Sequence, residues 1–339
     1  MHRSEFTLDL GAVRRNVQTL VRALRGAQLW AVVKANAYGH GADDVAGAAL
    51  AAGATALCVA TVAEGLALRR RFPESRVLVI GPSADDEVAA AREAQLELVV
   101  SSNDVPPGVR AHVKLDTGMG RWGLSELAAP AREVVGLMSH LAAADSDAAY
   151  TERQVERFRA ATAAYTHLER HIANSAGALR YPDAAFDAAR CGIAIYGLSP
   201  FETDPAEDGL APALRWTSHL AQVKRLRPGE STGYGRRFVA ETDTWIGVVP
   251  VGYADGFRRG LTGTSVLVDG ERRRVVGTVS MDAIAVELER ELPAGTSVVL
   301  IGDGVLAEHH ARVAGTIGYE IVCGLNTDPT RSRRVVVDG

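Results

Sequence analysis

Short apolar runs alternate with Ala-rich amphipathic stretches through residues 29–190. The eight runs, each as long as a buried strand, cover residues 29–33, 57–61, 77–80, 96–100, 111–116, 135–140, 170–174 and 186–190. Eight strands that alternate with helices are typical of an α/β fold, the parallel (β/α)8 TIM-type barrel. The competing arrangement is a doubly wound open sheet, but no G-x-G-x-x-G follows the first run to support its dinucleotide site.

The stretches between the runs predict the outer helices. A short strand over 1–9 and a helix over 10–24 precede the first run, and amphipathic helices are expected over 43–52, 64–71, 85–95 and 147–170. The connections 101–110 and 175–185 are too short for full helices. We therefore expect a barrel in which at least two outer helices are shortened.

The residue pattern changes after a Pro-containing acidic linker at 199–212. Val- and Thr-rich alternation with turn signals then predicts a mainly β domain, with one helix near 306–317. The sequence thus predicts a barrel over 10–212 and a mainly β domain over 213–339, to which the strand at 1–9 is added.

Lysine is rare in this chain. Of its 37 Lys and Arg residues, only Lys34, Lys114 and Lys224 are lysines. Arginine cannot supply a neutral amine that attacks a carbonyl carbon, so a lysine kept at the end of a buried run indicates nucleophilic chemistry. The alternative is that Lys34 and Lys114 are ordinary surface lysines.

Other polar residues also follow the predicted strands, where a barrel carries its active site. Asp116 to Arg121 follow the fifth run, and His140 ends the sixth. The loops after the last two runs offer the Ser175 hydroxyl and the amides of Gly192 and Ile193, which are suited to a phosphate. A reactive lysine and a phosphate cradle together indicate pyridoxal phosphate (PLP) as cofactor. The alternative for Ser175 is a helix cap.

Composition excludes several other classes. The net charge of −4 with mixed signs gives no reason to expect nucleic acid or a membrane as partner. No apolar stretch has the length of a membrane span, and no secretory signal is recognisable, so we expect a cytoplasmic protein. The odd set Cys58, Cys191 and Cys323 predicts neither disulfides nor a metal site.

The residues around Lys34 resemble the PLP-lysine motif of the alanine racemases (fold type III). Further stretches resemble the other motifs of this family in order, and together they cover nearly the whole chain: 114–121, 171–176, 190–198, 233–235, 250–256 and 280–282. The resemblance implies a homodimeric isomerase that interconverts L- and D-alanine and supplies D-alanine for peptidoglycan.

The resemblance also implies roles for individual residues. Lys34 would hold PLP and serve one face of the substrate, and Tyr234 from the partner subunit would serve the other. Arg190 would approach the pyridine nitrogen, oriented by His171, and His140 is a candidate neighbour of Tyr234. For each histidine, a structural role at the barrel rim is the alternative.

The remaining implied roles concern binding. Tyr38 and Tyr319 would bind the phosphate, and Asn174 and Ser175 belong to the same cofactor-binding set. Arg121 and the amide of Met281 would receive the substrate carboxylate, and Tyr253 would narrow the entrance. Lys114 would be carbamylated and pair with Arg121; the alternative is an unmodified lysine paired with Asp116.

The chain departs from the family pattern in places. Thr278 stands where a basic residue is usual, Ser280 replaces a frequent cysteine, and residues 324–331 follow the pattern only partly. A racemase of broader range, acting on serine or lysine, and a PLP-binding homeostasis protein are the alternative functions. A relative that decarboxylates its substrate would be expected to place an acid, rather than Arg190, at the pyridine nitrogen.

Overall fold

The computed structural model describes residues 2–339 and divides into two compact units, residues 1–11 with 212–339 and residues 12–211. In the second unit, eight parallel strands pair in the order β8-β7-β6-β5-β4-β3-β2-β9. Two backbone bonds, from Asp187 to Arg170 and from Arg190 to Ala173, join β9 to β8 and close the ring. This confirms the predicted (β/α)8 barrel. The barrel strands are β2 (Gln28–Val32), β3 (Ala54–Val59), β4 (Val77–Val79), β5 (Glu97–Val100), β6 (Ala111–Lys114), β7 (Val134–Met138), β8 (Glu169–His171) and β9 (Ala188–Cys191).

The barrel strands are almost continuously buried, because parallel strands in this fold are covered on both faces. Helices follow most of them, and the connection at 101–110 carries none, as expected. The predicted helix over 147–170 is shorter: it ends at Thr162, and turns at Tyr165 and Leu168 bring the chain back to β8. The helices of this part of the chain are α1 (Leu10–Ala23), α2 (Lys34–Tyr38), α3 (Ala42–Ala51), α4 (Val62–Arg71), α5 (Asp85–Glu93), α6 (Ala148–Thr162) and α7 (Ser175–Arg180).

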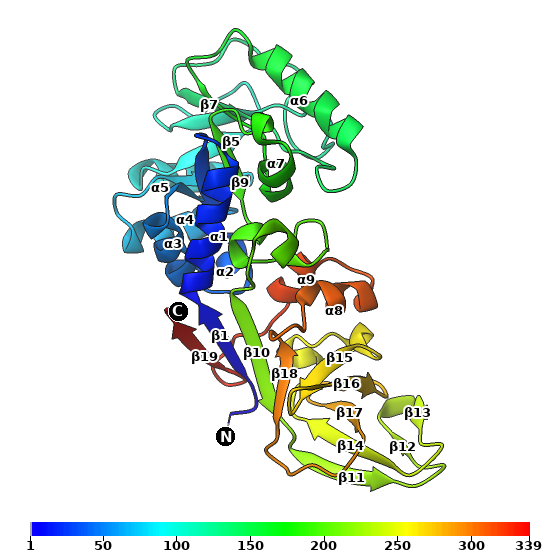
Figure 1. The fold of residues 1–339 in the computed structure, drawn as a ribbon. Coiled ribbons are helices and arrows are strands. Elements are labelled where there is room, and N and C mark those ends of the chain that lie inside the picture. The colour runs from blue at the N-terminus through cyan, green and yellow to red at the C-terminus, as the bar shows by residue number, and fades with distance from the viewer. Residues whose placement is uncertain (1) are drawn as a thin grey trace. The chain divides into compact units, whose positions relative to one another are not determined.

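The other unit is mainly β, which confirms the predicted class of the C-terminal part. Nine strands form a mixed sheet in the order β11-β14-β17-β16-β15-β18-β10-β1-β19, in which the N-terminal strand β1 lies between β10 and β19 (Figure 1). The bounds are β1 (Glu5–Asp9), β10 (Leu214–His219), β11 (Gln222–Leu226), β14 (Thr244–Val249), β15 (Ser265–Val268), β16 (Glu271–Val276), β17 (Ile284–Leu288), β18 (Ser297–Ile301) and β19 (Arg333–Val337). A small hairpin and two helices complete it: β12 (Ser231–Thr232), β13 (Phe238–Val239), α8 (Ala307–Ala314) and α9 (Gly318–Cys323).

Candidate active site

Lys34 lies just beyond the C-terminal end of β2, as predicted, and begins α2. The next four residues, Ala35 to Tyr38, all have φ between 51° and 53°, so α2 is a turn of left-handed helix. This conformation costs roughly 1–2 kcal/mol for each residue with a Cβ. The surrounding structure therefore has to hold this turn in place.

Two side chains hold the left-handed turn. Glu64 in α4 accepts the Ala35 amide with Oε1 (2.7 Å) and the Ala60 and Thr61 amides with Oε2. Asn36 accepts the Ala42 amide at 2.9 Å and so closes the loop onto α3. The turn is fastened at both ends, and it directs Tyr38 into the barrel mouth, where the side chain is 7% exposed.

Tyr38 contacts the loop that follows β9. A Cβ added at Gly192 would come within 2.5 Å of Tyr38 Oη, so only glycine leaves room for this hydroxyl. Ser175 Oγ accepts the Gly192 amide at 3.0 Å and the Ala194 amide at 3.4 Å. Two hydroxyls and a bare backbone thus converge, an arrangement suited to phosphate oxygens.

The residue that caps α7 is Asn174, whose side chain accepts the Gly177 amide at 2.9 Å. The alternative interpretation of Ser175 as the cap is therefore wrong. The Gly192 amide, predicted to face a phosphate, donates to Ser175 in this structure. Ser175 keeps its own hydroxyl hydrogen to donate.

Arg190 lies inside the barrel and is 3% exposed. Its guanidinium donates to His171 Nδ1, to the Ser139 carbonyl (2.7 Å) and to His140 Nδ1 (3.1 Å). Burial lowers the pKa of Arg190 to about 10, so the group is still a cation at neutral pH. Burial, and then the charge of Arg190, hold the pKa values of His140 and His171 well below the usual range. Both histidines are neutral acceptors for this cation.

Lys114 ends β6 and is 3% exposed. Burial, and then the neighbouring Arg121 cation, lower its pKa to about 8. Lys114 Nζ and Arg121 Cζ lie 5.4 Å and 4.9 Å from the centre of the Trp122 ring. Lys114 and Asp116 do not form an ion pair in the described chain; the Asp116 carboxylate accepts the amides of residues 118–120 instead.

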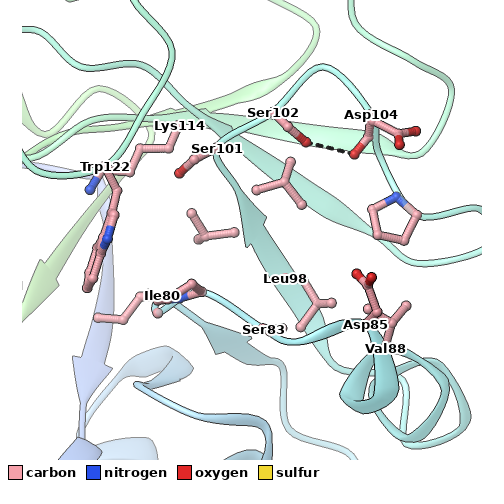
Figure 2. A pocket seen from close by; sticks show the side chains of 15 residues that line it. Ile80, Ser83, Asp85, Val88, Leu98, Ser101, Ser102, Asp104, Lys114 and Trp122 are labelled. Atoms are coloured by element: carbon pink, nitrogen blue, oxygen red, sulfur yellow. Dashed lines mark hydrogen bonds between the residues drawn. The ribbon is translucent and has the colours of Figure 1, made fainter.

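A recess reaches Lys114 from the side of β4 and β5, where the connection 101–110 has no helix. Figure 2 shows Lys114 and Trp122 together on one side of this pocket, with Asp85 and Asp104 on the other. The missing helix thus leaves a side opening to the lysine.

The β unit gathers the other predicted residues on neighbouring turns. The Tyr253 amide donates to the Ser280 carbonyl and the Ala254 amide to the Met281 carbonyl, both at 3.0 Å. A Cβ at Gly252 would come within 2.4 Å of the carbonyl oxygens of residues 280 and 281. The turns that carry Tyr253 and Met281 are therefore packed backbone to backbone.

Tyr234 and Tyr319 lie on segments next to these turns. Thr278 Oγ1 donates to the Tyr234 carbonyl at 2.8 Å. Tyr319 lies in α9, which Arg258 joins to the 252–258 segment through the carbonyl and the carboxylate of Glu320. Tyr234, Tyr253 and Met281 are 74%, 42% and 52% exposed in the single chain. All three side chains are thus exposed to solvent in the single chain.

Both halves of the chain match known sequences. Residues 8–200 match the family profile "Alanine racemase, N-terminal domain", and residues 213–335 match "Alanine racemase, C-terminal domain". The chain belongs to the alanine racemase family. The alanine racemase of Geobacillus kaustophilus is 40% identical over 93% of this chain and 90% of its own length. That of Lactiplantibacillus plantarum is 38% identical over 99% and 98%.

Solved structures of alanine racemases are similar to this chain over nearly its whole length. The crystal structure of alanine racemase from E. faecalis superposes with a TM-score of 0.91 at 36% identity and covers 99% of this chain and 98% of its own. Alanine racemase from Streptomyces coelicolor A3(2) gives 0.90 at 38% identity, with the same coverage. The predicted membership in the alanine racemase family is confirmed.

Sequence reasoning missed residues that shape this racemase site. Glu64, which holds the turn after Lys34, reads only as part of an N-terminal capping box. Glu97 and His112 are buried inside the barrel and connect to His171. The available signal was an acidic residue within the apolar run 96–100 and a histidine within the run 111–116.

Proposed function

We propose that this protein is a homodimeric, PLP-dependent alanine racemase that interconverts L- and D-alanine. The observation that carries the proposal is the placement of Lys34, Ser175 and Arg190 at or near the C-terminal ends of β2, β8 and β9, inside a chain that the family matches over both domains. Barrel enzymes carry their reacting groups at this end.

The residues present fit PLP. Lys34 supplies the amine for the cofactor's carbonyl carbon, and Tyr38, Ser175 and the backbone of residues 192–193 surround the place for its phosphate. Tyr319 and Asn174 belong to the same proposed binding set. When bound, PLP supplies the electron sink that makes the Cα proton of an amino acid acidic.

Racemisation needs proton-transfer groups on both faces of the substrate, because one proton leaves and another arrives from the opposite side. We assign Lys34 to one face and Tyr234 of the partner subunit to the other. The 74% exposure of Tyr234 in the single chain supports this assignment, since a catalytic tyrosine needs a surrounding site. His140 is held neutral beside Arg190. We propose it as the hydrogen-bonding neighbour of Tyr234.

Arg190 faces the pyridine nitrogen in this proposal, and His171 orients it. A guanidinium only donates hydrogen bonds, so it leaves that nitrogen without a proton. PLP held in this way would be a weaker electron sink, which would discourage side reactions of the substrate. A carboxylate at this place would do the opposite, which argues against a decarboxylase.

Arg121 and the Met281 amide are assigned to the substrate carboxylate, and Tyr253 to the entrance. Lys114 and Arg121 are neighbouring cations whose repulsion contributes to the low pKa of the lysine. Carbamylation joins the carbon of CO2 to Nζ and releases a proton, which leaves an anion beside Arg121. We propose this modification because it removes the repulsion and pairs the arginine.

We propose that the enzyme works in the cytoplasm, where it supplies D-alanine for the synthesis of peptidoglycan. No helix in residues 2–339 is long and apolar enough to cross a membrane. A broader range that includes serine or lysine is the second candidate, because side-chain pockets discriminate weakly between small substrates. A chiral assay of several L-amino acids, with and without added PLP, separates the two.

Two variants test the shared site. Lys34→Ala is expected to remove the visible absorption of bound PLP and all racemisation; retention of both refutes the assignment. Mixing inactive Lys34→Ala with inactive Tyr234→Phe is expected to restore activity through hybrid dimers with one intact site. If labelled subunits exchange and no activity returns, Lys34 and Tyr234 do not come from different subunits.

A further inference from the structure

A hydrogen-bonded chain runs through the barrel from Arg190 to the opposite end of the strands. Arg190 donates to His171 Nδ1, His171 Nε2 lies 2.8 Å from His112 Nδ1, and His112 Nε2 lies 3.0 Å from Glu97 Oε2. The two histidines are fully buried, and Arg190 and Glu97 are 3% and 4% exposed. Bulk water therefore does not compete for the hydrogen bonds between these four side chains.

Arg190 and Glu97, at the two ends of this hydrogen-bonded row, determine which ring nitrogen of each histidine carries the proton. A guanidinium can only donate, so His171 Nδ1 accepts and the His171 proton is on Nε2. His112 Nδ1 must then accept that proton, and His112 Nε2 donates to the Glu97 carboxylate. Burial lowers the pKa of both histidines, which are neutral with one proton each. One direction of donation satisfies these four groups. The Arg76 guanidinium also lies 3.3 Å from His112 Nε2, but it has closer acceptors in the Glu97 and Glu169 carboxylates, at 2.7 Å and 2.9 Å.

A glycine makes the contact between the two histidines possible. The strand β7 lies between β6, which carries His112, and β8, which carries His171, and its Gly136 pairs with His112. A Cβ at Gly136 would come within 2.2 Å of His112 Nδ1. Any other residue there displaces the atom that accepts the His171 proton.

Glu97 is held as an anion at the far end. Arg76 Nε and Arg110 Nε donate to its two oxygens at 2.8 Å each, and Arg76 also pairs with Glu169. Burial by itself raises the pKa of Glu97, but the hydrogen bond from His112 and then the contacts of Arg76 outweigh it and lower the pKa to about 2. The carboxylate remains an acceptor throughout the neutral range, which fixes the direction of donation.

We propose that His112 and Glu97 are positioning residues for racemisation, because they fix His171 in the tautomer that holds the Arg190 guanidinium. The proposal rests on the role assigned above to Arg190. Without His112, His171 has no acceptor for its Nε2 proton and can place the proton on Nδ1, where it opposes an N–H of Arg190. The Arg190 guanidinium then loses its imidazole acceptor in His171 and is oriented only by His140 and the carbonyls of residues 139, 171 and 172.

The decisive variant is His112→Phe, which fills the space and can neither accept nor donate. Two-bond 1H–15N correlation spectra of histidine-labelled holoenzyme and apoprotein report the His171 tautomer, with the signal assigned by its absence in His171→Asn. We expect the Nε2–H form in the wild type and its loss in His112→Phe. We also expect kcat of the PLP-saturated His112→Phe enzyme to fall roughly 10–100-fold, with KM for alanine changed less than about threefold.

Three further variants separate positioning from folding. His112→Asn can still accept from His171 Nε2 and is expected to recover the tautomer and much of kcat, while Gly136→Ala, which removes no ionisable group, should behave like His112→Phe. The matched control His310→Phe removes another buried neutral histidine, bonded to Thr264 and Leu300. It should lower the thermal unfolding midpoint but leave kcat and the His171 tautomer unchanged.

The outcomes are distinct. An unchanged His171 tautomer in His112→Phe, or a changed tautomer with wild-type kcat, overturns the positioning role while the proposed function stands. Racemisation by Lys34→Ala overturns the proposed function, and the spectra of the apoprotein still report whether the chain sets the tautomer, because they need no turnover.

Discussion

The hydroxyl of Tyr38 occupies the space that a Cβ of residue 192 would fill. The contact joins the left-handed turn after Lys34 to the loop after β9, which are otherwise separated by most of the barrel sequence. Gly192 has a negative φ of −114°, so the requirement for glycine is argued from this steric contact and not from a left-handed backbone.

Gly192→Ala should therefore weaken PLP binding by displacing Tyr38 from the proposed phosphate site. We expect the dissociation constant for PLP to rise about tenfold or more, a cost of about 1.4 kcal/mol, as measured by titration of the apoprotein. Gly47→Ala in α3 is the matched control, because a Cβ there meets only Phe72 at 3.7 Å. Equal PLP affinity in both variants would contradict the proposal that Tyr38 and Gly192 form part of the phosphate site.

Glu64→Ala should release the strained turn that follows Lys34. The side chain accepts three backbone amides, so we expect a loss of about 1–3 kcal/mol in the free energy of unfolding together with weaker PLP binding. Glu87→Ala removes a comparable capping contact at α5 and should cost only about 0.5–1 kcal/mol, with PLP affinity unchanged. Denaturant titrations and PLP titrations of both variants make the comparison.

Carbamylation of Lys114 should increase as the pH rises through about 8. The neutral amine is the form that attacks CO2, and the lowered pKa makes it abundant near neutral pH. With 13C-bicarbonate, we expect one carbamate resonance that disappears in Lys114→Arg. Lys224→Arg, at an exposed position, should keep the resonance. A signal that persists in Lys114→Arg would place the modification elsewhere.

The protein should lose stability as the pH falls below about 6.5. His140 and His171 have pKa values well below 6.5 when folded, so the unfolded chain takes up protons that the folded chain does not. Glu97, with a pKa lowered from 4.5 to about 2, adds a further loss between these two values. Chemical denaturation of the apoprotein at several pH values should show a smaller dependence of the free energy of unfolding on pH for His171→Asn than for the wild type.

The barrel, the β domain and the family could all be predicted from the sequence, since they depend on local patterns. Eight apolar runs with helices between them specify the parallel barrel, and the strand ends locate Lys34 and Arg190 at its mouth. The left-handed turn was not predictable, because the Ala-rich residues after Lys34 favour a right-handed helix. It exists because Glu64 and Asn36 hold it from other elements.

By itself, the sequence determined the residue types available for the chemistry and the order of the strands that carry them. Only the tertiary structure decided which of them meet: Tyr38 with Gly192, Asp116 with backbone amides rather than with Lys114, and His112 with His171 across Gly136. Strand position follows from local hydrophobic pattern, whereas contacts across a barrel depend on register, burial and the space that a glycine leaves.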